Sequence, residues 1–200
     1  MKNISPRSAL VSLSDKTNLD LLVSFLLERN VEIISTGGTY KAIKKITDAV
    51  IEVSEYTGHK EMMDGRVKTL HPKIHAGILA RRGEDTDILE SMDYKEIDIV
   101  VVNLYPFEET IKSGCSFEEA IEKIDIGGPT MIRAAAKNFK DVLVLSDPSD
   151  YEEMINEWNS KNGISYEFRK KQATKVFKKM SRYNRACLLY TSPSPRDGDE

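Results

Sequence analysis

The sequence is poor in the features that mark secreted, membrane-spanning and nucleic-acid-binding proteins. Its two cysteines, Cys115 and Cys187, are not closely spaced, which suggests a reducing compartment and no disulfide framework. No apolar run approaches the length of a transmembrane helix, and the first residues lack the apolar core of a signal peptide. A formal net charge of −3 argues against a nucleic-acid-binding surface. These absences predict a cytoplasmic protein with no membrane or nucleic-acid partner.

Several motifs of well-known catalytic and cofactor sites are also absent. The chain has neither the Walker phosphate-binding loop nor the G-x-G-x-x-G pattern of dinucleotide-binding domains, and it has no serine nucleophile elbow. His71 and His75 are four residues apart, but the glutamate of H-E-x-x-H is missing, and Pro72 disfavours a helical pairing of the two imidazoles. We therefore expect no metal centre.

What is present is an alternation of strand-like and helix-like segments. Strands are predicted at residues 9–14, 31–35, 49–54, 97–104 and 141–146. Helical periodicity separates them, and short connections of this kind predict a mostly parallel sheet with helices on both faces. The run at 97–104 is the most apolar, so we expect it to be central and buried on both faces.

Further helices are expected after the fourth strand and near the C-terminal end. One is predicted to begin at Pro129, because proline suits the first position of a helix. A long basic helix is predicted over residues 166–185. With 200 residues and 40% hydrophobic content, the chain is long enough for one core. We expect a single α/β domain over residues 1–186 and a non-homologous or disordered tail over 187–200.

A basic stretch at residues 64–77 has too little apolar periodicity for a long helix. It contains Arg66, Lys68 and Lys73 and is punctuated by Gly65 and Pro72. In an extended segment Arg66 and Lys68 lie on the same side. Two cations so placed repel one another unless they are solvated or share an anion. Both alternatives, a solvated surface and an anion site, stay open at this point.

Two turns follow predicted strands at the edge where parallel sheets bind ligands. They are Ser12-Leu13-Ser14-Asp15-Lys16 after the first strand and Thr36-Gly37-Gly38-Thr39 after the second. Glycines allow close approach of a ligand to the backbone, and the N–H groups at the start of a helix favour anions. Each turn alone is weak evidence. Together, and with Arg66 and Lys68 nearby, they favour binding of a phosphate monoester.

Two other groups of residues could carry chemistry. Arg133 and Lys137 share a face of the helix predicted after Asp125, which allows either a proton-passing Lys–Asp pair or a helix cap with two surface cations. Asn103-Leu104-Tyr105-Pro106 closes the fourth strand. An amide and a phenol at a strand end could meet a ligand, although a core tyrosine with a bonded hydroxyl is equally ordinary.

The motifs become more specific when they are taken together and in order. They are Ser12 to Lys16, Ser35-Thr36-Gly37-Gly38-Thr39, Gly65-Arg66-Val67-Lys68-Thr69-Leu70-His71-Pro72, Asn103-Leu104-Tyr105-Pro106-Phe107, Asp125-Ile126-Gly127-Gly128 and Arg133-Ala134-Ala135-Ala136-Lys137-Asn138. This order resembles the N-terminal inosine monophosphate (IMP) cyclohydrolase domain of the bifunctional purine-biosynthesis enzymes, over about residues 8 to 186. The resemblance implies a methylglyoxal-synthase-like three-layer α/β fold. It also implies closure of 5-formamidoimidazole-4-carboxamide ribotide to IMP with loss of water.

The resemblance also implies roles for individual residues. The implied catalytic residues are Lys68, Tyr105, Asp125 and Lys137. The implied substrate and phosphate contacts are Ser12, Ser14, Asp15, Lys16, Thr36, Gly37, Gly38, Thr39, Arg66, Lys68, Thr69, Val102, Asn103, Asp125, Ile126, Gly127 and Gly128. Neither a metal nor an organic cofactor is required, and the implied partners are the purine ribotide and a second copy of the chain in a homodimer.

The chain departs from the family in two respects. Full-length relatives carry a fused transformylase domain for which this sequence has no room, so we expect formyl transfer to be absent. The family tends to show Tyr-Asp-x-Ala-Ile where this chain has Tyr183-Asn184-Arg185-Ala186-Cys187, and the similarity stops there. Two alternatives remain: a methylglyoxal synthase, which would want an Asp-Pro motif at the end of the fourth strand, and a nucleotide-sensing regulatory module.

Overall fold

The computed structural model describes residues 2–63, 65–105, 114 and 116–191. Three of the sequence-based expectations concern residues outside these ranges. They are the motif residues Pro106 and Phe107 after the fourth strand, the absence of a disulfide at Cys115, and the tail from residue 192 onward. Within the described ranges, no helix combines the length and apolar character needed to cross a bilayer.

The sheet contains five strands, and all of its pairings are parallel. The strands are β1 (Ser8–Leu13), β2 (Glu32–Ser35), β3 (Ile51–Glu52), β4 (Ile99–Asn103) and β5 (Leu143–Leu145). Their order is β3-β2-β1-β4-β5, which confirms the predicted parallel α/β architecture. All five residues of β4 are buried, as expected of its apolar sequence. The central position, however, belongs to β1, and β4 lies between β1 and β5.

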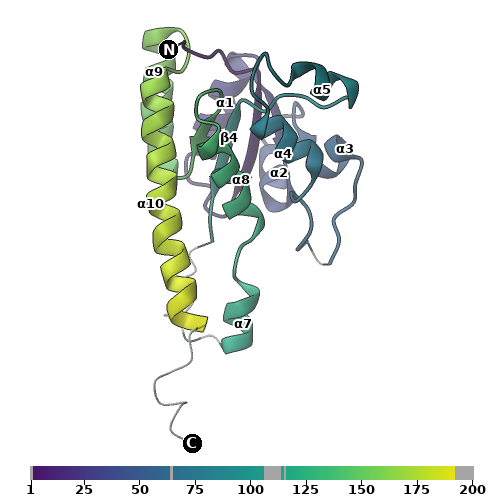
Figure 1. Ribbon diagram of the computed structural model, residues 1–200, viewed down its shortest axis with the longest axis vertical. Coiled ribbons are helices and arrows are strands. Elements are labelled where there is room, and N and C mark those ends of the chain that lie inside the picture. The colour runs from purple at the N-terminus through teal and green to yellow at the C-terminus, as the bar shows by residue number, and fades with distance from the viewer. Residues whose placement is uncertain (1, 64, 106–113, 115, 192–200) are drawn as a thin grey trace, which may run out of the picture.

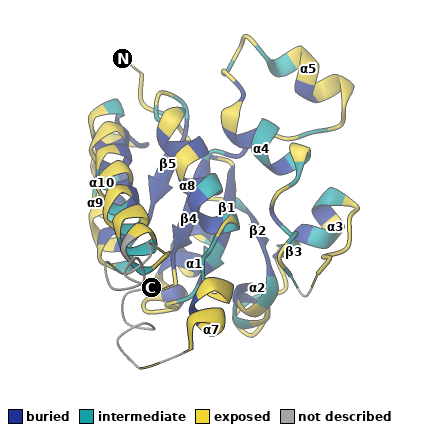
Figure 2. Cartoon of the chain, turned by 60° about the horizontal axis from the view of Figure 1, so that its bottom comes forward, coloured by how far each residue is buried: buried dark blue, intermediate teal, exposed yellow. Residues whose placement is uncertain are grey.

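The helices connect the strands and extend beyond the last of them (Figure 1). They are α1 (Leu19–Glu28), α2 (Gly37–Ile43), α3 (Val53–Thr57), α4 (Pro72–Leu79), α5 (Thr86–Ser91), α7 (Phe117–Glu122), α8 (Gly127–Lys137), the 3-10 helix η1 (Pro148–Asp150), α9 (Tyr151–Lys161) and α10 (Tyr166–Thr191). In both overall views α9 and α10 lie together at one side of the molecule (Figures 1 and 2), and Figure 2 shows β5 as the strand nearest to them.

Side chains alternate between two buried clusters, one on each face of the sheet. In β1, Ala9 and Val11 belong to the cluster that α1 and α9 cover, whereas Leu10 belongs to the cluster that α4, α8 and α10 cover. This alternation is the period of two expected of a strand buried on both faces. Figure 2 shows the strands as the buried centre and the helices with exposed outer surfaces. The predicted three-layer arrangement is therefore confirmed.

The third strand is shorter than predicted. Residues 49–54 were expected to be extended, but β3 ends at Glu52 and α3 begins at Val53. Val53 and Tyr56, three residues apart, are both buried in the second cluster, so one helical turn buries both side chains. Gly58, at φ 70°, then ends the helix in the left-handed conformation that glycine adopts at little cost.

The basic stretch is also more helical than predicted, because α4 begins at Pro72. Proline fits the first position of a helix, where its missing N–H has no partner to lose. His71, in an extended conformation, caps the helix by accepting a hydrogen bond at Nδ1 from the Lys73 N–H (3.1 Å). Ile74 and Ile78 then lie one turn apart on the buried side. The segment from Arg66 to the cap is a loop that leads into this helix.

Two other helix boundaries differ from the prediction. Helix α8 begins at Gly127 and not at Pro129, so proline occupies its first turn without starting it. Helix α10 continues beyond Arg185 to Thr191, although the sequence changes character after Ala186. The carboxyl ends of the strands, and with them the turns that follow β1, β2 and β4, meet at one edge of the sheet because every strand runs in the same direction.

Candidate active site

Asn103, at the end of β4, fixes the turn that follows β1. Its side-chain Oδ1 accepts hydrogen bonds from the backbone N–H groups of Ser14 (2.7 Å) and Asp15 (3.1 Å), and its Nδ2 donates to the Asp15 carbonyl (2.7 Å). The Ser14 hydroxyl also donates to Asn103 Oδ1 (2.9 Å). Asn103 is buried together with Val102 before it, while Ser12 is half-buried in β1. This amide therefore has a structural role in shaping the loop.

Thr39 attaches the start of α2 to the same turn. Its buried hydroxyl accepts a hydrogen bond from the Leu13 N–H (2.8 Å) and donates to the Leu13 carbonyl (3.0 Å). Both polar groups of the last residue of β1 are thereby satisfied by one side chain. Thr39 thus holds the Gly37-Gly38 turn next to the loop after β1, at the edge of the sheet where the sequence places both turns.

Two lysine ammonium groups lie at the Gly37-Gly38 turn. Lys68 Nζ is 3.3 Å from the position that a Cβ on Gly37 would occupy, and Lys16 Nζ is 4.0 Å from the corresponding position on Gly38. Gly37 has φ 56°, a conformation that favours glycine. The Thr39 and Tyr40 N–H groups donate to the Thr36 carbonyl (3.2 Å each), whereas the N–H groups of Gly37 and Gly38 come too early in α2 to find a partner within the helix. Two positive side chains and free backbone donors at one turn form an arrangement suited to a phosphate group.

The two cations of the basic stretch have different partners. Lys68 forms an ion pair with Glu61, and its side chain is 26% exposed. Arg66 forms an ion pair with Glu122 of α7, with Nε 3.0 Å from Glu122 Oε1, and its side chain is 65% exposed. The structure therefore brings Lys68 to the Gly37 turn but directs Arg66 toward α7. The phosphate contact implied for Arg66 requires a different side-chain orientation.

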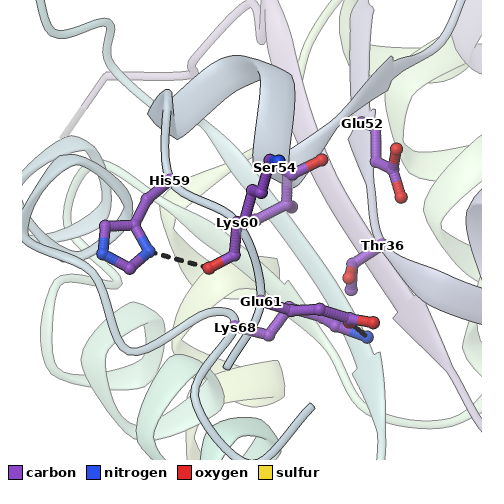
Figure 3. Close-up of a pocket in the computed structure, with 8 residues that line it drawn as sticks. Thr36, Glu52, Ser54, His59, Lys60, Glu61 and Lys68 are labelled. Atoms are coloured by element: carbon purple, nitrogen blue, oxygen red, sulfur yellow. Dashed lines mark hydrogen bonds and ion pairs between the residues drawn. The ribbon is translucent and has the colours of Figure 1, made fainter. Parts of the chain in front are cut away.

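A pocket of about 310 Å³ lies beside the Gly37 turn (Figure 3). Its lining residues come from the residue after β2, the end of β3, the start of α3, the loop before the basic stretch and the basic stretch itself: Thr36, Glu52, Val53, Ser54, His59, Lys60, Glu61 and Lys68. Only Thr36 and Lys68 belong to the predicted site. Glu52 is the last residue of β3, but the strand predicted over residues 49–54 placed this carboxylate inside the strand, so the rule that ligands bind at strand ends could not point to it.

The start of α8 forms the other part of the site. Asp125 Oδ1 accepts a hydrogen bond from the Gly128 N–H at 3.0 Å. Burial raises the pKa of the Asp125 carboxyl above its usual value, although the N–H groups of Gly128 and Gly127 act in the opposite direction. A Cβ on Gly127 would lie 2.7 Å from Thr69 Oγ1, and one on Gly128 would collide with the Asp125 carboxylate. Both glycines are therefore needed for close packing.

Replacing Gly127 with alanine is expected to lower the melting temperature by roughly 4 °C or more, because the new methyl group meets the buried Thr69 hydroxyl. The measurement is thermal unfolding followed by circular dichroism. The matched variant is Thr69→Ala/Gly127→Ala, which removes the colliding oxygen and should recover most of the loss. A Gly127→Ala protein as stable as the unmodified chain would show that this contact is not tight.

The remaining predicted residues are more scattered. Tyr105 lies two residues after β4 and is 59% exposed, and Ile126, the residue before α8, is 57% exposed. Lys137 is exposed and is the last residue of α8, about 15 Å along the helix axis from Gly127. The structure therefore does not bring Lys137 together with Lys68 and Asp125, and its catalytic role stays a prediction from the resemblance.

The described residues hold no group of three or more histidine, cysteine or acidic side chains in reach of one metal ion. His71 and His75, which invited a metal interpretation, are occupied at the start of α4. His71 Nδ1 accepts the capping hydrogen bond, and His75 Nδ1 lies 3.3 Å from the His71 carbonyl.

The fold and the site define an α/β domain whose all-parallel sheet carries cationic and glycine-rich turns at its strand ends. A family model described as "MGS-like domain" matches residues 19–130, and one described as "AICARFT/IMPCHase bienzyme" matches residues 135–197. The chain belongs to the family of MGS-like domains. A solved structure described as "Crystal structure of ForH" is 31% identical and covers 94% of this chain and 100% of its own, with a TM-score of 0.80.

Several curated proteins similar to this chain carry the name "Bifunctional purine biosynthesis protein PurH". Those of Clostridium perfringens (strain SM101) and Clostridium botulinum (strain Loch Maree) are each 56% identical over 182 residues. That of Clostridium kluyveri is 54% identical over 180 residues. The matches cover 90%, 90% and 89% of this chain but 36% of each relative. The chain therefore spans about a third of the length of these relatives.

Proposed function

We propose that this chain is an IMP cyclohydrolase, which closes 5-formamidoimidazole-4-carboxamide ribotide to IMP with loss of water in purine biosynthesis. The name of the similar proteins and the description of the second family model support the pathway and the reaction. The observation that carries the proposal is the meeting of Lys16 and Lys68 at the Gly37-Gly38 turn. A ribotide carries a phosphate monoester, and this turn offers it two cations and backbone donors.

The ring closure requires an oxyanion to be stabilised and protons to be moved. The carboxamide nitrogen attacks the formyl carbon, and negative charge develops on the formyl oxygen. In the proposed reaction the ammonium group of Lys68 stabilises this charge. The carboxamide nitrogen must then lose a proton, and the former formyl oxygen must leave as water.

Asp125 is suited to carrying those protons. Because burial raises its pKa, this carboxyl can hold a proton at a pH where an exposed aspartate has lost it. An acid–base group works best when its pKa lies near the working pH. Tyr105, exposed at the end of β4, is the second proposed member of the relay. No step in this scheme calls for a metal or an organic cofactor.

Three finer statements are part of the proposal. We assign the transformylase activity of the bifunctional relatives to the part of their length that this chain does not match. We also propose a homodimer and a cytoplasmic location, both of which the resemblance implies. Light scattering coupled to gel filtration tests the dimer, and a mass equal to the 22.6 kDa of one chain would contradict it.

The function is tested by following the absorbance of the purified chain mixed with formylated ribotide, with mass spectrometry of the product. The proposal predicts steady turnover to IMP. Binding without turnover would instead identify a nucleotide-sensing module. Formation of methylglyoxal from dihydroxyacetone phosphate, without ring closure, would identify a synthase.

A further inference from the structure

Helix α10 reaches the candidate active site through one side chain. The Tyr183 hydroxyl accepts a hydrogen bond from the backbone N–H of Asp125 at 2.7 Å. These residues are 58 positions apart in the sequence. The ring of Tyr183 packs against the buried cluster that β4, α8 and α10 share, so the hydroxyl is held from a rigid element. Burial raises the pKa of Tyr183 to about 12, so the hydroxyl remains protonated at neutral pH.

Asp125 is consequently held at two points. Its carboxylate is fixed by the Gly128 N–H (3.0 Å), within α8, and its main chain is fixed by Tyr183 of α10. Asp125 follows α7 and precedes α8, so it lies on a short connection and not inside a helix. The geometry of such a connection depends on the contacts that its residues make with neighbouring elements. An N–H group that loses its acceptor in a half-buried position is costly, and the connection would shift to recover one.

We propose that Tyr183 is a positioning residue, which sets the place of the Asp125 carboxyl relative to the Gly127-Gly128 turn and so makes α10 part of the active site. This inference rests on the proposed function of Asp125. Small displacements of an acid–base group are expensive, because proton transfer needs heavy atoms at hydrogen-bond distance from one another. Tyr183 itself does not touch the reacting atoms. It acts through the backbone of Asp125.

The test is Tyr183→Phe, which keeps the packed ring and removes the hydroxyl alone. We expect kcat for ring closure to fall about tenfold, the size expected for one lost hydrogen bond to a half-buried donor. KM should change less than about twofold, because Lys16, Lys68 and the Gly37 turn are untouched. In an Asp125→Asn background the same substitution should cause no further loss, since it acts only through that carboxyl.

Two matched variants keep the result specific. Tyr166→Phe removes a hydroxyl from the first residue of the same helix, far from Asp125, and should leave kcat unchanged. Cys187→Ala removes a side chain that hydrogen-bonds the Tyr183 hydroxyl without touching Asp125, and it should also leave kcat unchanged. An unchanged kcat in Tyr183→Phe would overturn the inference. So would losses that multiply in the Asp125→Asn background.

Hydrogen exchange at the Asp125 amide separates this inference from the proposed function. Tyr183→Phe should speed that exchange at least tenfold relative to the unmodified chain, whatever reaction the site catalyses. If the Asp125 amide exchanges faster in Tyr183→Phe but the unmodified chain does not close the ring, the positioning role of Tyr183 is supported and the cyclohydrolase function is rejected. If the unmodified chain closes the ring but its Asp125 amide exchanges at the same rate as that of Tyr183→Phe, only the positioning role of Tyr183 is rejected.

Discussion

Replacing Lys68 with alanine is expected to lower kcat for ring closure by about 10²- to 10³-fold. This is the range found when one preorganised donor is removed from an oxyanion site. Lys68 lies at the Gly37 turn with its side chain 26% exposed, so the charge is screened less than that of a fully solvated lysine. The measurement is steady-state turnover with formylated ribotide.

The loss should not be a consequence of unfolding. The partner of Lys68, Glu61, is 55% exposed, and ion pairs of this kind contribute about 0–1 kcal/mol to stability. The melting temperature should therefore stay within a few degrees of that of the unmodified chain. Lys45→Ala, an exposed lysine just after α2, is the charge-matched control and should keep full activity. Near-normal rates in Lys68→Ala would reject the role assigned to this residue.

Asp125→Asn is expected to lower kcat by about 10²- to 10⁴-fold, the usual contribution of a general acid–base group. Asparagine keeps a side-chain oxygen for the Gly128 N–H, so the start of α8 should keep its structure. What the variant loses is the ability to carry a proton. The circular dichroism spectrum of Asp125→Asn should match that of the unmodified chain. If the variant unfolds, its lost activity cannot be attributed to the loss of a proton carrier.

The pH profile gives the same variant a second measurement. In the unmodified chain the rate should fall on the acid side as Asp125 becomes protonated. Because burial raises its pKa, this fall should occur above the range of an exposed aspartate, whose pKa is about 3.9. The residual activity of Asp125→Asn should lack this acid limb. If both proteins show the same fall in rate at acid pH, that fall is caused by the titration of another group.

Much of the fold could be predicted because it depends on local patterns. The apolar runs gave all five strands, and their alternation with helices predicted the parallel sheet. The errors fall where tertiary packing decides the outcome. Val53 was expected to be extended in the strand at residues 49–54, but it shares one buried side of α3 with Tyr56. The helical start at Pro72 was missed because proline was taken as an obstacle, although it fits the first position of a helix.

The site could be predicted only in part, for a related reason. Because the carboxyl ends of parallel strands meet at one edge of the sheet, the turns after β1, β2 and β4 are expected to lie together. Hydrogen bonds of Asn103 and Thr39 with the end of β1 and the turn after it do connect these turns. The rule does not say which way a long side chain points on a loop. Arg66 and Lys68 looked equivalent in the sequence, yet one pairs with α7 and the other lies at Gly37.

Contacts over long sequence separations leave no local signal at all. Lys137 shares a helix with the Gly127-Gly128 turn, but the length of that helix carries it away from the site. The hydrogen bond between Asp125 and Tyr183 depends on how α10 packs on the sheet, and nothing in either neighbourhood predicts it.

The most direct test of the whole account is a crystal structure of this chain with IMP bound. The account requires the phosphate to contact the backbone at residues 37 and 38 together with the ammonium groups of Lys16 and Lys68. It also requires the purine ring to reach hydrogen-bond distance of the Asp125 carboxyl. A nucleotide found elsewhere on the molecule, or one whose phosphate avoids both lysines, would contradict it.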